Sequence, residues 1–283
     1  MTNQNICADL NEELVPVTRN IRKINGFQDF DPLRPSQISD KLRLFLDVCL
    51  QKKQSIRKDL DAAGFSCISC GKCCKRADDD NSVFILPTEI EKIEAKTGLD
   101  RKEFIMPLFP DFYGVSDDQT VSVNFSLFPD ILKSVSDQID GHGRIHTFGW
   151  MFRRLKNGTC IFLDETNKCK IYPVRPGLCR TYPFYFQGSA IEIGECEGIG
   201  TVLKTETDSA KELTGAIYER LENEHNDFLK TQAFLEKESK TIKYNTKEGL
   251  EKALENLSQG ILNFVVYDGS GIYEADISII LIK

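Results

Sequence analysis

Eight of the ten cysteines in this 283-residue chain fall into two sets whose spacing suits metal binding. The first set, Cys67-x2-Cys70-x2-Cys73-Cys74, places four thiols within eight residues. A loop with two residues between thiolates can curl so that its sulfur atoms meet at one centre, as in zinc knuckles and iron–sulfur loops. The second set has wider gaps and comprises Cys160, Cys169, Cys179 and Cys196. We therefore expect these eight cysteines to be the metal ligands.

The spacing of the first set bears on which metal is bound. Cys67, Cys70 and Cys73 match the first part of the bacterial ferredoxin run, in which a distant cysteine completes the cluster. The side chains of adjacent residues tend to point in different directions. Cys74 would therefore bind a second metal, or bridge two metals, more easily than it would bind the same single zinc ion as Cys73. The pattern favours an iron–sulfur cluster of the 4Fe–4S type and leaves zinc as the alternative cofactor.

Composition excludes several other classes of protein. Ten cysteines in a chain of this length are too few for a disulfide-stapled scaffold. The N-terminus lacks the basic and apolar regions of a secretion signal, and the apolar run Ile277–Ile282 is far shorter than the ~18 residues that span a membrane. We therefore expect a cytoplasmic protein, with reduced thiols and no membrane partner. A net charge of −7 argues against nucleic acid, and an unknown protein partner stays open.

The elements before the second set follow from hydrophobic periodicity and from proline and glycine signals. Apolar residues at helical spacing predict an amphipathic helix from Ser36 to near Gly64, with Cys49 on its apolar face as a buried side chain. Cys7 is expected to be a bystander. Between the two sets we expect a strand at 82–86, a helix from Thr88 that stops at Gly98, a short helix at 101–105, and a loop-rich stretch at 107–147 with one strand at 121–125.

Turn signals dominate around the second set. Asn157-Gly158 lies between two β-prone runs, 150–155 and 160–163, and predicts a hairpin. Residues 175–180 are expected to form one helical turn, and 182–186 and 190–193 to form two short strands.

The fold class predicted from these elements is α+β. Beyond Gly200 we expect two amphipathic helices and a terminal strand pair that turns at Asp268-Gly269. The expected organisation is an extended lead-in (1–36), a helix plus cysteine-cluster metal-binding domain (37–200), and C-terminal helices with the strand pair (201–283).

Charged residues and histidines near the cysteines have two possible roles. Arg175 and Arg180 flank Cys179, and such cations can lower the pKa of a thiol or can simply be solvated surface charge. His142 and His146 stand four residues apart, but the glycines around them oppose a helix, so a structural role is favoured over metal ligation.

Two motifs enclose the cysteines. The first is Phe65-x-Cys67-x2-Cys70-Gly71-x-Cys73-Cys74, and the second runs from Cys160-x-Phe162-Leu163 to Cys169-x-Ile171-Tyr172-x2-Arg175-Pro176-x2-Cys179-Arg180. Together they resemble the CxxCxxCC cysteine-cluster family, also called the YkgJ family, which is described as a zinc- or iron-chelating domain. The resemblance covers roughly Phe65 to Gly200 and implies that the seven cysteines from Cys67 to Cys179 are ligands.

The resemblance supplies no reaction, and no catalytic residue can be assigned. A flagellin lysine methylase counted among the family's relatives carries an iron–sulfur cluster, which extends the likeness to redox or methyl-transfer chemistry. However, no SAM-binding signature is matched, and radical-SAM spacing from Cys70 and Cys74 would need a thiol where Ala77 stands. The alternative is a zinc-stabilised structural or protein-interaction module without catalysis, which would be colourless and would unfold with chelators.

Overall fold

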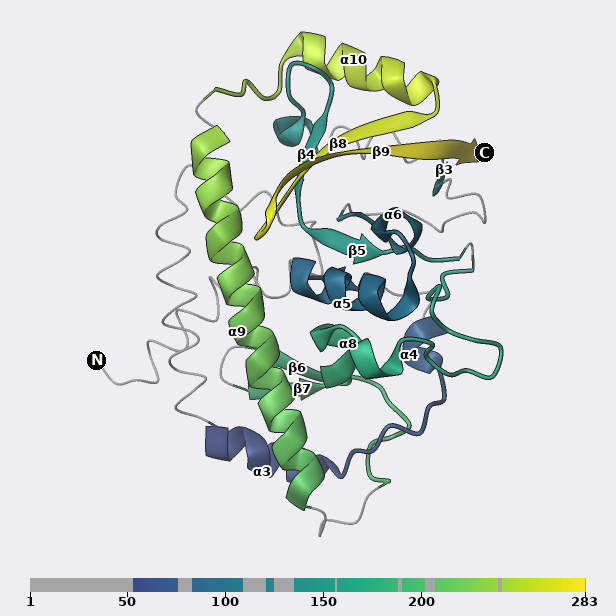
Figure 1. The fold of residues 1–283 in the computed structure, drawn as a ribbon, viewed down its shortest axis with the longest axis vertical. Coiled ribbons are helices and arrows are strands. Elements are labelled where there is room, and N and C mark those ends of the chain that lie inside the picture. Colours follow the sequence, from purple (N-terminus) through teal and green to yellow (C-terminus); the bar gives the residue numbers. More distant parts are fainter. Residues whose placement is uncertain are drawn as a thin grey trace, which may run out of the picture. The chain divides into compact units, whose positions relative to one another are not determined.

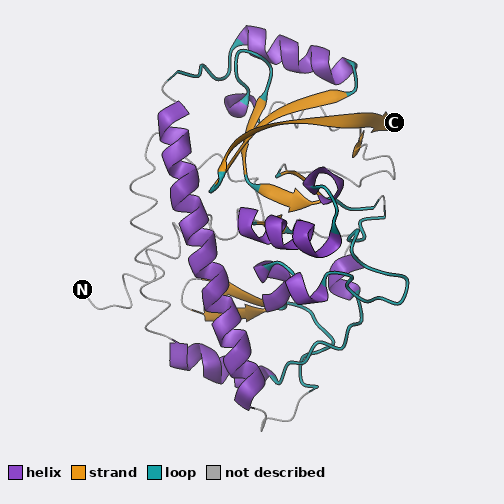
Figure 2. Cartoon of the chain, viewed as in Figure 1, coloured by secondary structure: helices purple, strands orange, loops and turns teal. Residues whose placement is uncertain are grey.

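Helices and short strands alternate along the chain, and in its described part the strands form three small sheets (Figure 2). The computed structural model describes residues 53–75, 83–108, 121–124, 135–155, 157–187, 190–201, 207–238 and 241–282 (Figure 1). This mixture of helices and sheets confirms the predicted α+β class. None of the helices within those ranges combines the length and the apolar character needed to cross a membrane.

The chain divides into two compact units, each made of two stretches of sequence. Unit 1 comprises the chain up to Cys73 together with Asp164–Asn226, and unit 2 comprises Cys74–Leu163 and Asp227–Lys283. The boundaries expected at residues 36 and 200 stay a prediction, and the lead-in at 1–36 lies outside the described residues, as do Cys7 and Cys49.

Unit 1 contains a β-hairpin and several helices. The hairpin pairs β6 (Phe184–Gln187) with β7 (Ala190–Ile193) in antiparallel register, as the sequence predicted. Its core includes Ile171, Phe184 and Ile217, each at most 2% exposed. The helices are α3 (Lys53–Ala63), the 3-10 helix η3 (Tyr172–Val174), α8 (Gly177–Thr181) and the first part of α9 (Thr207–Glu238), with α4 (Lys72–Lys75) crossing the boundary between the units in sequence.

Helix ends in the described chain follow the predicted stop signals. Helix α3 ends at Ala63, and Gly64 after it has a φ of 56°, within the left-handed region that glycine favours. Its predicted beginning at Ser36 lies outside the described residues.

The described part of unit 2 contains two sheets, several helices and the second part of α9. Its helices are α5 (Pro87–Thr97), α6 (Arg101–Phe104) and α10 (Lys247–Ser258), together with the 3-10 helix η2 (Ser136–Gln138). One sheet has the order β1-β5-β2, with β1 (Phe84–Ile85), β5 (Trp150–Phe152) and β2 (Ile105–Pro107). The other has the order β3-β9-β8-β4, with β3 (Val121–Asn124), β9 (Gly271–Ile282), β8 (Ile261–Asp268) and β4 (Ile145–Phe148).

The C-terminal strand pair is the longest ladder of unit 2. Strands β8 and β9 are antiparallel and turn between Asp268 and Gly271, as predicted, and α10 packs along β8 (Figure 1). Helix α5 also stops where the sequence predicted, since Gly98 takes a φ of 73° and its N–H donates to the carbonyl of Glu94.

Two expectations about unit 2 need correction. The stretch 107–147 is not wholly loop-like beyond its predicted strand, because β4 also forms there, with Ile145, His146 and Thr147 all buried. A strand buried on both faces has no alternation of polar and apolar residues, which is why periodicity missed it. The turn at Asn157-Gly158 forms and carries one bridge between Arg154 and Cys160, but β5 pairs with β1 and β2 instead of with residues 160–163.

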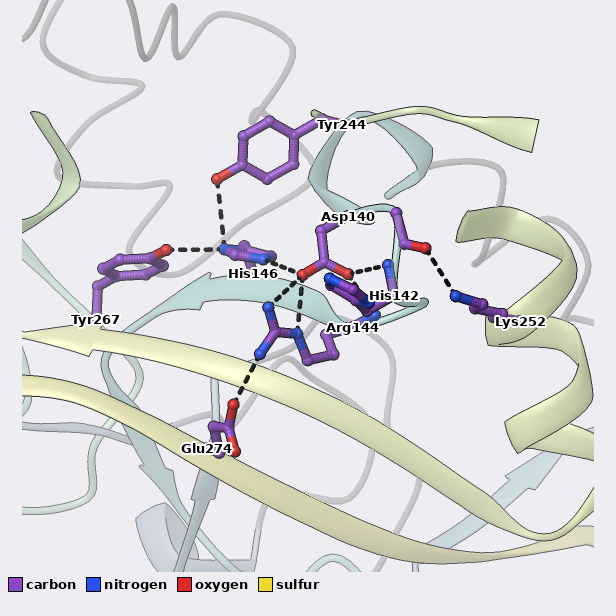
Figure 3. A network of polar contacts seen from close by, with 9 residues as sticks. Asp140, His142, Arg144, His146, Tyr244, Lys252, Tyr267 and Glu274 are labelled. Atoms are coloured by element: carbon purple, nitrogen blue, oxygen red, sulfur yellow. Dashed lines mark hydrogen bonds and ion pairs between the residues drawn. The ribbon is translucent and has the colours of Figure 1, made fainter. Parts of the chain in front are cut away.

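A polar network around His146 explains how a histidine is tolerated in the core of unit 2 (Figure 3). Its Nε2 lies 3.1 Å from Asp140 Oδ2, and its Nδ1 lies 2.9 Å from the hydroxyl of Tyr267 and 3.3 Å from that of Tyr244. Burial lowers the pKa of His146 in spite of the opposing effect of Asp140. The imidazole is therefore neutral near pH 7 and links β4 to β8.

Asp140 anchors the other side of this network. Its carboxylate accepts the backbone N–H groups of His142 and Arg144, at 2.9 and 3.0 Å, and the Nε–H of Arg144 at 2.8 Å. Burial alone would raise the pKa of Asp140, but these donors and His146 lower it to about 2. The turn that leads into β4 is thus closed around an ionised carboxylate.

Candidate metal centre

None of the eight cysteines of the two sets is part of a disulfide, and six of them belong to unit 1 and two to unit 2. Cys67 and Cys70 lie in the loop after α3, Cys73 and Cys74 in α4, Cys160 after the turn at Asn157-Gly158, Cys169 before η3, Cys179 in α8 and Cys196 after β7. All except Cys74 and Cys160 belong to unit 1.

The loop of the first set is curled by two left-handed residues. Ser69 has a φ of 54° and Gly71 a φ of 71°. The ring of Phe65, at the start of the loop, packs edge-on against the buried Phe184 of β6, with 5.3 Å between the centroids. The loop is therefore anchored at its entry and bent between its cysteines.

Gly71 lets this loop approach the segment that precedes Cys169. A Cβ atom at Gly71 would lie 3.0 Å from the Cβ of Asn167, closer than most carbon contacts. Asn167 is itself left-handed, in a turn where Asp164 Oδ1 accepts the backbone N–H groups of Thr166 and Lys168, both at 2.8 Å. Both the left-handed φ and the close approach of Asn167 thus explain why position 71 of the first motif is a glycine.

A second segment of unit 1 holds the other side of the same loop. The N–H of Ser66 donates to the carbonyl of Gly198 at 3.0 Å, and the N–H of Gly200 donates to that of Ala63 at 2.9 Å. A Cβ atom at Gly198 would collide with the carbonyl oxygen of Ser66. Because Gly198 is two residues after Cys196, these contacts bring the last cysteine of the second set beside the first set.

The electrostatics of Cys196 reflect this arrangement. Burial raises the pKa of its thiol, the N–H of Gly198, with its nitrogen 3.4 Å from Sγ, lowers it, and the thiols of Cys70, Cys73 and Cys67 raise it again. Negative charge on any of these sulfur atoms therefore opposes charge on Cys196. A bound cation would remove that repulsion.

The pKa of Cys169 is shifted by the same kinds of interaction. Burial raises the pKa of its thiol, the N–H of Ile171 and the guanidinium of Arg175 lower it, and Cys73 raises it. Arg175 stacks over the ring of Tyr172, with its guanidinium carbon 3.6 Å from the ring centroid, and this contact holds the guanidinium in place. Arg175 thus acts on the Cys169 thiol through its charge.

Other flanking cations have carboxylate partners. Lys72 forms an ion pair with Glu197, and Arg180 forms one with Glu219 at 3.3 Å, all four side chains being largely exposed. Sequence reasoning missed both carboxylates and gave Gly198 no role. The close approach of Gly198 to Ser66 is a long-range contact without a local sequence signal.

Five thiols of unit 1 interact electrostatically, Cys196 with Cys67, Cys70 and Cys73, and Cys169 with Cys73, but they form no finished coordination sphere. In the part of the chain that the structure describes, no three histidine, cysteine, aspartate or glutamate side chains are grouped tightly enough to hold a metal ion. The donor chemistry still fits a thiophilic metal, since thiolates select zinc and iron–sulfur clusters. His146 is not a candidate metal ligand, because both of its ring nitrogens have hydrogen-bond partners in unit 2.

Unit 2 contributes two members of the cysteine pattern. The N–H of Cys160 donates to the carbonyl of Cys74 at 2.8 Å, so the two half-buried residues are adjacent. Cys179 lies in the middle of α8 in unit 1 and is also half-buried.

Comparison with known proteins decides the family. Residues 66–213 match the model of CxxCxxCC, whose description is "Putative zinc- or iron-chelating domain". The chain belongs to the CxxCxxCC family. All eight cysteines of the two sets lie within the matched residues, whereas Cys7 and Cys49 lie outside them.

This CxxCxxCC protein is also similar to an uncharacterized protein, MJ0661, of Methanocaldococcus jannaschii. The two are 30% identical over 142 residues, which cover 49% of this chain and 56% of that protein. The chain therefore spans little more than half the length of this curated relative. No solved structure matches the chain.

Proposed function

We propose that this CxxCxxCC protein holds an iron–sulfur cluster, with zinc as the alternative metal, through its two sets of cysteines. The proposed ligands are Cys67, Cys70, Cys73, Cys74, Cys160, Cys169, Cys179 and Cys196. The observation that carries the proposal is the approach of the Cys196 segment to the loop of the first set, through Ser66 and Gly198.

Within this proposal, Cys196 is the distant thiol that completes the set of Cys67, Cys70 and Cys73. The thiols of all three raise the pKa of Cys196. Three cysteines at x2 spacing completed by a remote one are the ferredoxin arrangement, which supports a 4Fe–4S cluster. Cys169 and Cys179 are the further donors of unit 1, and Cys74 and Cys160 are those of unit 2.

Two classes of activity are compatible with such a centre. A cluster that changes oxidation state would support redox or methyl-transfer chemistry. A zinc ion bound by four thiolates would make the domain a structural or protein-interaction module, because zinc has no redox chemistry and such sites leave no open coordination position. Visible absorption that bleaches on reduction separates the first class from the second.

The experiment that tests the proposal is anaerobic purification followed by analysis of iron, zinc and acid-labile sulfide. We expect ~4 iron and ~4 sulfide per cluster, or zinc without sulfide for the alternative. Cys196→Ser should lower the metal content, whereas Cys49→Ser, outside both sets, should keep it. The proposal is wrong if no metal copurifies and all eight thiols titrate freely.

A further inference from the structure

Helix α9 holds the short helix α8 through two adjacent contacts within unit 1. Arg180 Nη1 of α8 lies 3.3 Å from Glu219 Oε2 of α9, on the exposed side of the pair. One residue further along each helix, Arg220 Nη1 donates to the hydroxyl of Thr181. Consecutive residues of α8 are thus bound by consecutive residues of α9.

The second contact is buried, which distinguishes it from an ordinary surface ion pair. Thr181 is fully buried, and the Arg220 side chain is 8% exposed. The Thr181 hydroxyl donates back to the carbonyl of Gly177 at 2.9 Å, so it links Arg220 to the first residue of α8. Glu224, one turn along α9, lies 3.4 Å from Arg220 Nε and balances the buried charge.

Helix α8 depends on such contacts for its position. It has only 5 residues, and isolated helices shorter than about 12 residues are marginal in water. Helix α9, with 32 residues, is a far longer support. Cys179 lies in the middle of α8, between Gly177 and Thr181, so whatever fixes this turn also fixes its thiol.

We propose that Arg220 is a positioning residue for the metal centre, because its hydrogen bond to Thr181 holds α8, and with it Cys179, in place. The inference rests on the proposed function, in which Cys179 is a ligand. Arg220 lies beyond the residues that match the family model, which end at 213. The part of α9 that lies beyond the matched residues therefore supports a proposed centre whose ligands all belong to the matched domain.

The test compares variants of the full chain that carry bound metal. Thr181→Val removes the hydroxyl and keeps the side-chain volume, Thr181→Ser keeps the hydroxyl, and Arg220→Met removes the charge. Arg180→Gln breaks only the exposed contact and serves as the matched control, and Cys179→Ser is the reference for a lost ligand. The readouts are the rate of metal release to excess chelator and the visible spectrum of the iron- or cobalt-loaded protein.

Thr181→Val and Arg220→Met should release metal roughly ten- to a hundredfold faster than the native chain and shift the spectrum toward that of Cys179→Ser. Thr181→Ser should restore native behaviour, and Arg180→Gln should stay within about twofold. Native release rates and spectra in a folded Thr181→Val variant would overturn the inference while leaving metal binding intact. A native chain without metal would overturn the proposed function and this inference together, and metal analysis tells the two failures apart.

Discussion

At the scale of single residues, the glycines beside the cysteines determine how closely the two sets approach each other. Gly71 follows Cys70 and faces Asn167, and Gly198 follows Cys196 at two residues and faces Ser66. Larger side chains at either position would push a loop of the second set away from the first. The non-cysteine residues of the motif are therefore part of the site's geometry.

Gly71→Ala tests this reading, with Gly200→Ala as its control. Both glycines are left-handed, with φ of 71° and 73°, so both substitutions should cost about 1 kcal/mol of backbone strain. Only Gly71 has a close neighbour, because nothing lies within 4 Å of a Cβ atom at Gly200. We expect Gly71→Ala to lower metal content and Gly200→Ala to keep it. Equal metal content in the two variants would contradict the role given to Asn167.

Loss of His146 would remove several buried polar contacts from unit 2. His146→Leu would remove one donor to Asp140 and one hydrogen-bond partner of Tyr267 from the core, at a cost of about 2–4 kcal/mol. Tyr244→Phe removes the 3.3 Å contact with His146 and the hydrogen bond with Tyr267, keeps both shorter contacts of His146, and should cost only about 1 kcal/mol. Urea unfolding measures both, and a His146→Leu variant as stable as Tyr244→Phe would show that the network contributes little.

At the scale of elements, the second half of α9 meets the turn between β8 and β9 in unit 2. Asp268 in this turn accepts Trp150 Nε1–H at 2.7 Å and is buried. Asp227 of α9 accepts the N–H of Gly269 at 2.9 Å. The carboxyl groups of Asp227 and Asp268 thus both accept hydrogen bonds at or beside this turn. Burial and the charge of Asp268 raise the pKa of Asp227 to about 7.

This contact predicts a pH dependence of stability. Asp227 keeps its proton to about pH 7 in the folded chain but loses it near pH 3.8 when unfolded, so its stabilising contribution is complete below pH 3.8 and declines as the pH rises through 7. The Gly269 N–H and Lys230 lower the pKa of Asp227 and so oppose this rise, whereas Glu89 adds to it.

Asp227→Asn should remove this decline, on the order of 1 kcal/mol between pH 5 and 8 after allowance for partial exposure. Glu236→Gln, an exposed carboxyl on the same helix, is the control and should leave the pH profile unchanged. The measurement is the free energy of unfolding in urea at each pH. A native profile in Asp227→Asn would contradict the contribution of this carboxyl group.

Elements with local signals could be predicted, and those fixed by distant contacts could not. Gly98 ended α5 as predicted, and the β6–β7 and β8–β9 hairpins form where turn residues separate β-prone runs. Strand β4 was not predicted, because a strand buried on both faces lacks the alternation of polar and apolar residues that marks a half-buried strand. The contact between Arg220 and Thr181 joins residues 39 positions apart, and no pattern within either helix reveals it.

At the scale of the whole molecule, the division into units places six of the eight cysteines with α8, the β6–β7 hairpin and the first part of α9. The two groups of four seen in the sequence are thus redistributed, since Cys74 and Cys160 belong to the other unit. Spacing along the chain is the reason for proposing these eight cysteines as ligands. It could not predict this distribution, because the boundary between the units falls between the adjacent residues Cys73 and Cys74.

The central claim is that sulfur atoms of these cysteines bind iron or zinc, and X-ray absorption at the metal edge of the purified protein tests it most directly. The account predicts a first coordination shell made of sulfur, at ~2.3 Å if the metal is zinc, with iron neighbours beyond it if a cluster is present. Cys196→Ser should lose metal or replace a sulfur neighbour by oxygen. A shell of nitrogen and oxygen in the native chain, or no bound metal, would contradict the account.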